Sequence, residues 1–170
     1  MSTITKEYTD DAIKTLEWNE HIRQRPGMYI GNTGDGSRPD DGIYILIKEV
    51  LDNSIDEFSQ GNGKEIRIDI EDNTVSIRDY GRGIPLESVI DCASKLNTGG
   101  KFDSDVFQKS VGLNGVGLKA VNATSSYFYI ESFREGLSKW AEFSAGNLLN
   151  SGYHENTGQK NGTFVKYIAD

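Results

Sequence analysis

The chain has 170 residues, of which 36% are hydrophobic and 26% charged, and its net charge is −8. This composition is that of a globular domain large enough to form a core, and the acidic balance argues against a chain that grips DNA or an anionic membrane by itself. The single cysteine, Cys92, excludes an internal disulfide framework and a zinc site built from cysteines.

The N-terminal part predicts an arm and two helices. Residues 1–14 are polar and form the arm, and one folded domain follows over residues 15–170. Apolar residues recur at helical spacing over residues 43–60, which predicts a helix there. The elements expected before it are a helix over 15–25, a short extended piece over 28–30 and a loop over 31–42.

The helix predicted over 43–60 carries an unusual polar face. Glu49, Asn53 and Asp56 stand at i, i+4 and i+7, so with about 3.6 residues per turn they stack along one face. A base, a metal-binding oxygen and an acid in a row suit chemistry on a phosphate. The alternative is a solvated face, which usually mixes acids with Lys or Arg, and the only Lys nearby is Lys48.

The C-terminal two thirds predict a hairpin, two helices and a series of strands. Apolar residues alternate with polar ones before and after a turn at 71–73, which predicts the hairpin. The remaining expected elements are helices over 86–96 and 115–123, strands over 127–133, 139–143 and 163–168, a loop at 97–113 and a loop or hairpin at 147–161. This order predicts an α+β fold, in which helices cover one face of a mixed or mostly antiparallel sheet.

A first glycine motif, Asp79-Tyr-Gly81-Arg-Gly83-Ile-Pro85, follows the hairpin. Taken alone, it favours a tight turn between a strand and a helix. The functional alternative is a purine pocket. The Asp79 carboxylate would accept a hydrogen bond from the exocyclic amine of adenine, and a fixed water would bridge to the ring nitrogen. The two glycines would let the backbone lie flat against the base.

A second glycine motif, Gly112-Leu-Asn-Gly115-Val-Gly117, opens the helix predicted over 115–123. Glycines at a helix start expose backbone N–H groups to a phosphate, although a flexible loop tip gives the same pattern. The glycine order is the reverse of the dinucleotide-binding fingerprint, and neither Lys101 nor Lys119 precedes the Ser or Thr of a P-loop. Both of those folds are therefore excluded.

The three motifs, followed by a late Gly162-Thr163, occur in an order that resembles the Bergerat-type ATP-binding fold. Gyrase-type topoisomerases, heat-shock chaperones, sensor histidine kinases and mismatch-repair clamps share this fold. Arg25-Pro-Gly-Met-Tyr-Ile-Gly31 and Thr98-Gly-Gly-Lys-Phe102 narrow the resemblance to the B subunit of bacterial type IIA topoisomerases, meaning DNA gyrase or topoisomerase IV. It covers nearly the whole chain.

The resemblance implies a two-layer α/β sandwich that binds and hydrolyses ATP with Mg²⁺. At the reacting end, Glu49 matches the general base for the attacking water, and Asn53 matches the residue that gives a side-chain oxygen to Mg²⁺. At the other end, Asp79 matches the residue that recognises adenine, and Thr163 matches the hydroxyl that shares its bridging water. Asp56 has no assigned role: it could orient Asn53, orient a water or bond to the backbone.

Further nucleotide-binding residues are implied in the same way. Glu57 and Arg82 match an ion pair beside the base, with Arg82 over the purine face, although a solvated loop charge is the alternative for this arginine. The others are Gly83, Ile84 and Pro85 along the pocket wall, Lys101 in a lid, and Gly112, Leu113, Asn114, Gly115, Val116 and Gly117 in the phosphate loop.

The resemblance also implies contacts beyond the nucleotide. Arg134 matches an arginine at the pocket mouth where coumarin-type inhibitors bind, and a surface strand arginine is the alternative. Tyr8 and Ile13 match arm residues that reach into the partner subunit when ATP closes a homodimer. An A-type DNA-cleaving subunit and DNA complete the implied assembly. No apolar run reaches membrane-spanning length and no signal peptide is present, so a cytoplasmic protein without a membrane partner is expected.

Some features depart from the best-known gyrase pattern. Asn114 replaces a frequent His and Phe107 a frequent Tyr; the stretch 85–101 is shorter and the loop 31–42 is longer. With these departures both gyrase and topoisomerase IV stay open, and topoisomerase IV is the preferred interpretation. A different class of function is a nucleotide-binding module with little turnover, because the family takes a phosphate-sensing lysine from a later transducer domain that this fragment lacks. A mismatch-repair or chaperone ATPase would have another sequence at 25–31.

Overall fold

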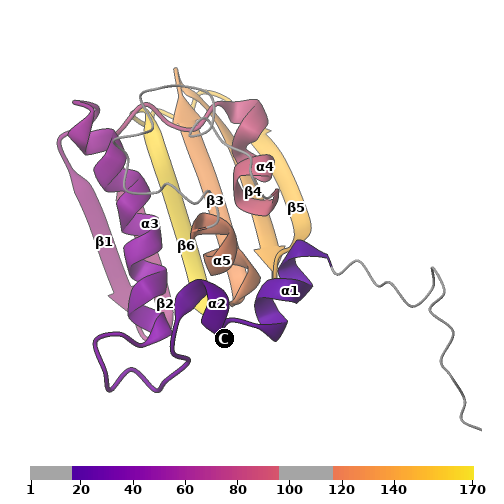
Figure 1. Ribbon diagram of the computed structural model, residues 1–170. Helices are drawn as coiled ribbons and strands as arrows, with labels where there is room; N and C mark the ends of the chain where they lie inside the picture. The colour runs from indigo at the N-terminus through magenta and orange to yellow at the C-terminus, as the bar shows by residue number, and fades with distance from the viewer. Residues whose placement is uncertain (1–16, 96–116) are drawn as a thin grey trace, which may run out of the picture.

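The computed structural model describes residues 17–95 and 117–170, in which a six-stranded sheet carries helices on one face (Figure 1). The strands are β1 (Ile66–Glu71), β2 (Thr74–Asp79), β3 (Ser125–Arg134), β4 (Leu137–Ser144), β5 (Asn147–His154) and β6 (Gly162–Ala169). The helices are α1 (Trp18–Gln24), α2 (Gly27–Ile30), α3 (Gly42–Ser59), α4 (Val89–Ser94) and α5 (Gly117–Ala123), with a 3-10 turn over Leu86–Ser88.

The sheet has the strand order β1-β2-β6-β3-β4-β5, and all its neighbouring strands are antiparallel. The last strand in the chain, β6, lies between β2 and β3. The end of the first hairpin and the beginning of β6 are therefore neighbours, because β6 runs antiparallel to β2. The predicted α+β architecture, with helices on one face, is confirmed.

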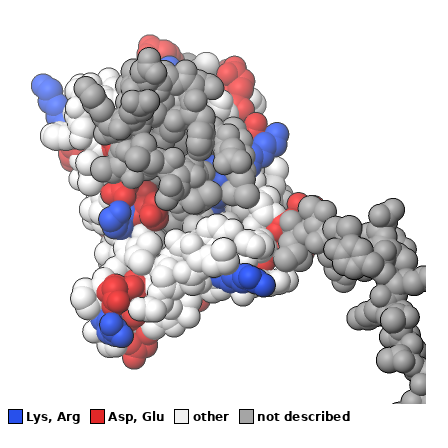
Figure 2. Space-filling view, viewed as in Figure 1, with Lys and Arg blue, Asp and Glu red and all other residues white. Residues whose placement is uncertain are grey.

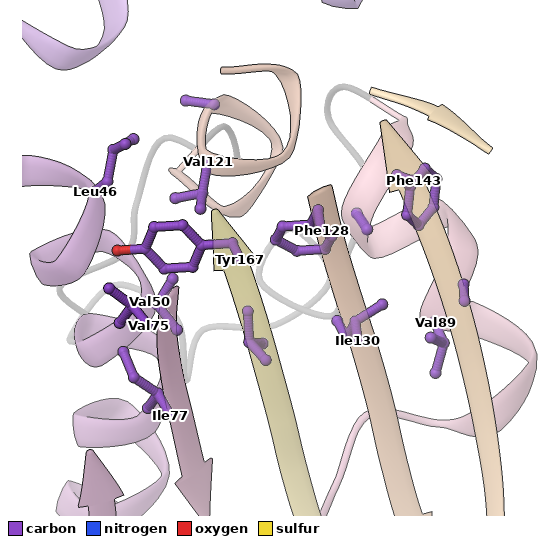
Figure 3. Close-up of a cluster of buried hydrophobic side chains, with 14 of the residues drawn as sticks. Leu46, Val50, Val75, Ile77, Val89, Val121, Phe128, Ile130, Phe143 and Tyr167 are labelled. Atoms are coloured by element: carbon purple, nitrogen blue, oxygen red, sulfur yellow. The ribbon is translucent and has the colours of Figure 1, made fainter. Parts of the chain in front are cut away.

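The core lies between the sheet and the helices (Figure 3). Helix α3 contributes Leu46 and Val50 from one stripe, as expected for an amphipathic helix over a sheet. Ile77 of β2 and Tyr167 of β6 meet this stripe, and Phe128 packs against other helices further along the sheet. Burying one such side chain stabilises the fold by about 1.5–3 kcal/mol.

The edge strand β1 extends beyond the cover of α3. Its isoleucines alternate as predicted, and by register they share the helix-side face with Ile77. Ile68 and Ile70 are nevertheless 45% and 61% exposed. Period-two alternation therefore predicted the strand correctly, whereas burial depends on how far α3 reaches across the sheet.

The short segment expected to be extended over 28–30 is helical instead. Helix α2 begins after Pro26, whose φ of −60° and ψ of −31° already suit a helix. The backbone nitrogens of Tyr29 and Ile30 both donate to the Pro26 carbonyl at 2.9 Å. Proline ended the first helix, as predicted, but it also started the next one.

Other element predictions differ in their bounds. The segment 147–161 takes the hairpin alternative, because Asn147–His154 forms β5 and pairs with β4. The helix expected over 86–96 is a 3-10 turn followed by the shorter α4. The arm of residues 1–14, the loop at 97–113 and residues 115–116 lie outside the described residues. Among the described helices, none is long and apolar enough to cross a membrane.

Candidate nucleotide site

Asp79 is a buried carboxylate at the end of β2, only 6% exposed. Its Oδ1 accepts hydrogen bonds from the backbone nitrogens of Gly81 at 3.0 Å and Thr163 at 3.2 Å. Burial raises the pKa of Asp79 above its ordinary value, and the bonds from its donors offset this only in part. A carboxylate held in this way is a fixed acceptor at the place where the first glycine motif begins.

Ser54 binds the other oxygen of Asp79, and it is a site residue that none of the sequence motifs singles out. Its Oγ donates to Oδ2 of Asp79 at 3.1 Å from the inner face of α3, where Ser54 is 4% exposed. Its position in the sequence indicates burial, because Ser54 follows the buried Leu46 and Val50 at i+4 spacing on the inner face of α3. A polar residue in an apolar stripe requires a buried partner.

Glu57 and Arg82 form the expected ion pair. Oε1 of Glu57 accepts from Arg82 Nη2 at 2.8 Å, and Oε2 accepts from the backbone nitrogen and Nε of the same arginine at 2.9 and 3.2 Å. Burial raises the pKa of Glu57, but its hydrogen bonds and ion pair with Arg82 outweigh burial and leave the pKa below its ordinary value. The pair fixes the first glycine motif to the C-terminal half of α3.

Gly81 and Gly83 lie where larger residues would collide with this arrangement. A Cβ on Gly81 would come within 2.8 Å of the Glu57 side chain. Gly83 has a φ of +80°, which favours glycine, and a Cβ there would lie 2.7 Å from the Phe133 carbonyl and 3.0 Å from Cγ of Arg134. The glycine motif is therefore packed between α3 and the end of β3.

The predicted pocket wall continues from Gly83 to Ile84 and Pro85, next to the end of strand β3. Ile84 packs against the hydrophobic core, and its carbonyl accepts a hydrogen bond from the buried Ser132 Oγ at 2.6 Å. The side chain of Arg134, at the end of β3, is partly buried near Gly83. Pro85 is exposed. Arg134 is thus adjacent to the first glycine motif, and its place at a pocket mouth stays a prediction.

Glu49 of α3 lies against the first residue of α5. A Cβ added to Gly117 would overlap the Glu49 carboxylate, with Oε2 as the nearest atom. One turn further along α3, Asn53 donates from Nδ2 to the Glu49 carbonyl at 3.1 Å. Asp56 is buried, at 6% exposure. The structure therefore brings the acid–amide–acid helix together with the last glycine of the second motif.

Several predicted residues cannot be placed in this geometry. They lie outside the described ranges 17–95 and 117–170, and their roles stay predictions. They are Tyr8 and Ile13 of the arm, Lys101 of the lid, Phe107, and Gly112, Leu113, Asn114, Gly115 and Val116 of the phosphate loop.

A family model described as "Histidine kinase-, DNA gyrase B-, and HSP90-like ATPase" matches residues 39–144, more than half of the chain. The chain belongs to this ATPase family. The matched range contains α3 and both glycine motifs in the sequence. In the described residues, α3 contacts the first glycine motif and Gly117, the last glycine of the second.

Individual members of the ATPase family are similar over almost the whole chain. The B subunit of DNA topoisomerase 4 from Borreliella burgdorferi is 58% identical over 166 residues, covering 98% of this chain and 28% of the relative. The B subunit of DNA gyrase from Mycoplasma genitalium is 38% identical over 177 residues, covering 96% and 26%. The resemblance to the B subunits of type IIA topoisomerases is confirmed, and the chain spans about a quarter of the length of these relatives.

A solved member of the ATPase family has the same fold. The crystal structure of the 43K ATPase domain of Thermus thermophilus gyrase B, in complex with an aminocoumarin, superposes with a TM-score of 0.69 at 32% identity. The match covers 91% of this chain and 40% of that one. It supports the two-layer architecture independently of the motifs.

On the helix side, the described surface of this ATPase-family chain carries both signs of charge. Figure 2 shows acidic and basic side chains in small mixed groups on the described part of the helix side. A hollow of about 690 Å³ is lined by Glu131, Phe133 and residues between Tyr153 and Gln159. Among the predicted site residues that the structure describes, none lines that hollow, so it is separate from the place where α3 meets the first glycine motif.

Proposed function

We propose that this chain is the ATP-binding and ATP-hydrolysing region of a type IIA topoisomerase B subunit. The observation that carries the proposal is that one helix, α3, contacts both the first glycine motif and Gly117, the last glycine of the second motif. Glu49, Ser54 and Glu57 of α3 contact Gly117, Asp79 and Arg82 respectively. Family membership supports the same conclusion.

Glu49 is proposed as the general base. Its carboxylate lies at the start of α5, and the sequence predicted to form the phosphate loop immediately precedes that helix in the chain. A water between the carboxylate and the terminal phosphate would lose its proton to Glu49 as its oxygen attacks the phosphorus in line with the leaving oxygen. Gly117 provides the room for the carboxylate, because any side chain there would occupy the same space.

Asn53 is proposed as the protein ligand of Mg²⁺, which would neutralise charge on the phosphates when bound. Its Nδ2 donates to the Glu49 carbonyl at 3.1 Å, which orients the amide one turn of α3 from the proposed general base. The amide oxygen is the atom of this side chain that can bind a metal ion. The described residues contain no group of three or more His, Cys, Asp and Glu side chains suited to a metal ion. One protein oxygen, phosphate oxygens and waters form a normal Mg²⁺ environment, so Asn53 fits the ion.

Asp79 is proposed to recognise adenine. When ionised, its carboxylate can only accept, and adenine offers an exocyclic amine as a donor. Thr163 donates its backbone N–H to Oδ1, and its hydroxyl is proposed to share the bridging water with Asp79. Arg82, anchored on both oxygens of Glu57, would cover one face of the base.

The proposed assembly contains two copies of the full-length subunit, an A-type DNA-cleaving subunit and DNA. ATP binding would close a dimer gate, with the arm residues Tyr8 and Ile13 reaching into the partner, and hydrolysis would reset it after strand passage. The identity of 58% with a topoisomerase IV relative, against 38% with a gyrase relative, supports topoisomerase IV within this family.

Substitution of Asp79 by Asn tests the proposal. An amide can present a donor to the adenine amine, so we expect the affinity for ATP to fall by about tenfold or more, equivalent to roughly 1.4 kcal/mol. Isothermal titration of the intact protein with ATP measures it. Asp69→Asn makes the same chemical change at an exposed position on β1 and should leave affinity unchanged. Unchanged affinity in Asp79→Asn would exclude the adenine assignment.

The second candidate function is nucleotide binding with little turnover by this chain alone. The observation that favours it is that the chain spans only 28% of the topoisomerase relative. An ATPase assay beside the binding titration separates the two functions. Tight binding with negligible phosphate release would support the binding module, and release at a steady rate would support a self-sufficient ATPase.

A further inference from the structure

Arg78 is a buried arginine directly before Asp79 in β2. Its side chain lies on the face of the sheet opposite to the face that carries the Asp79 side chain. The two residues are consecutive in β2, and successive side chains in a strand point to opposite faces. Arg78 pairs with Phe164 of β6 in the register and is 8% exposed. Most arginines stay at the surface, so a position that buries one needs a physical explanation.

The guanidinium of Arg78 joins two backbone segments that both lead into the candidate site. Nη1 donates to the carbonyl of Asp79, and Nη2 donates to the carbonyl of Lys160 at 2.6 Å. Lys160 lies two residues before β6, whose second residue, Thr163, donates to the Asp79 carboxylate. One planar side chain thus fixes the backbone of Asp79 and the segment that carries its partner.

Aromatic rings and a glycine hold the guanidinium in this position. Its central carbon lies 4.4 Å from the ring centre of Tyr80 and 4.6 Å from that of Phe133. Gly162, with a φ of +145°, leaves no room for a side chain, because a Cβ there would overlap the Asp79 carbonyl and the Arg78 guanidinium. The two rings, the glycine and the two carbonyl acceptors therefore hold the Arg78 side chain in one conformation.

Stability alone does not explain a buried guanidinium. Removing the charge from water is unfavourable, and burial lowers the pKa of Arg78 below its ordinary value despite nearby acidic groups that raise it. A hydrophobic residue of similar length often serves the fold as well or better than a buried charge. A methionine could not bridge the two carbonyls, and this bridging is the property that arginine adds.

We propose that Arg78 is a positioning residue for the adenine end of the site, acting through the carbonyls of Asp79 and Lys160 from the far side of the sheet. The proposal rests on the proposed function, in which Asp79 and Thr163 contact the base. Its consequence is selective: Arg78 should affect recognition of the base but not of the phosphates, which bind at the other end of α3.

The experiment compares Arg78→Met with Arg67→Met in the intact protein, using ATP and inorganic triphosphate as ligands in competition titrations. Arg67 is the matched control. It is directly across from Arg78 in the β1–β2 register and its guanidinium lies 5.7 Å from the Tyr80 ring centre, but it is exposed and pairs with Glu65. We expect Arg78→Met to weaken ATP about tenfold and inorganic triphosphate not at all, and Arg67→Met to change neither.

Two outcomes would overturn the proposal: unchanged ATP affinity in folded Arg78→Met, or an equal loss for both ligands, which would indicate a general structural role. If Arg78→Met does not fold, Arg78→Lys replaces it, since an ammonium keeps the charge but cannot bridge both carbonyls in the same plane.

A second measurement is hydrogen exchange at the Thr163 amide. This exchange should become faster in the variant that loses ATP affinity, and an unchanged rate would contradict the mechanism. If the unsubstituted protein does not bind ATP, the proposed function fails and not this inference alone.

Discussion

At the residue scale, the acids of α3 have similar chemistry but different surroundings. Glu57 is paired with Arg82, and its pKa is lowered. Glu49 lies against the backbone of Gly117 at the start of another helix. Asp52, on the same helix, pairs with Lys48 at 2.8 Å. The position of Glu49 beside Gly117, at the start of α5, therefore makes it the proposed candidate for proton transfer.

Glu49→Gln in the full-length protein tests that assignment. The amide keeps the size of the side chain but cannot take a proton from water, so we expect kcat to fall by about 10²–10⁴ while ATP affinity stays nearly unchanged. Steady-state phosphate release and a binding titration measure the two quantities. Asp52→Asn removes a carboxylate from the same helix without touching Gly117 and should retain turnover. Full turnover in Glu49→Gln would show that another group is the base.

At the element scale, α3 organises the site because it is long and amphipathic. Its 18 residues span both the Glu49 end and the Glu57 end of the candidate site. Its periodicity made it predictable from the sequence, including the face that carries Glu49 and Asn53. Helix α2 was not predictable in this way, because four residues are too few to establish a helical period.

Gly117→Ala tests the contact between α3 and α5. Alanine favours a helix over glycine, yet the added Cβ would overlap the Glu49 carboxylate, so we expect turnover and nucleotide affinity both to fall. Gly27→Ala is the matched control, because Gly27 is also the first residue of a helix and a Cβ there meets nothing within 4 Å. ATPase rates and binding titrations of both variants measure the effect. Normal activity in Gly117→Ala would mean that Glu49 need not stay in this position.

At the scale of the whole molecule, the buried carboxylate of Asp79 lowers the stability of the folded protein while it serves the proposed adenine site. An acid whose pKa is raised in the folded state binds its proton more tightly there than in the unfolded chain. Stability is therefore lost as the pH rises from the ordinary value of 3.8 through the raised pKa, and at neutral pH the folded protein carries the full penalty. A ligand that donates to Asp79 would offset it.

Thermal unfolding of the protein at neutral pH tests this coupling. ATP at about a hundred times its dissociation constant should stabilise the folded state by about 2.7 kcal/mol, which is a rise of several degrees in Tm. Asp79→Asn should unfold no earlier than the unsubstituted protein without nucleotide, because it removes the buried charge, but ATP should barely raise its Tm. GTP is the control ligand for the base. A clearly lower Tm of Asp79→Asn without nucleotide would show that Asp79 has a stabilising role.

The sequence by itself determined the class of the fold, the elements with a long or regular period, and the residue types suited to phosphate and adenine chemistry. Glycine spacing and helical periodicity are local properties, so Asp79, Glu49 and their motifs could be found without coordinates. Only the tertiary structure decided which atoms meet. The contacts of Ser54 with Asp79 and of Glu49 with Gly117 depend on the packing of α3, and those of Arg78 with Lys160 and of Thr163 with Asp79 depend on the placement of β6 beside β2. Contacts between segments distant in the chain leave no periodic signal, because the fold alone brings them together.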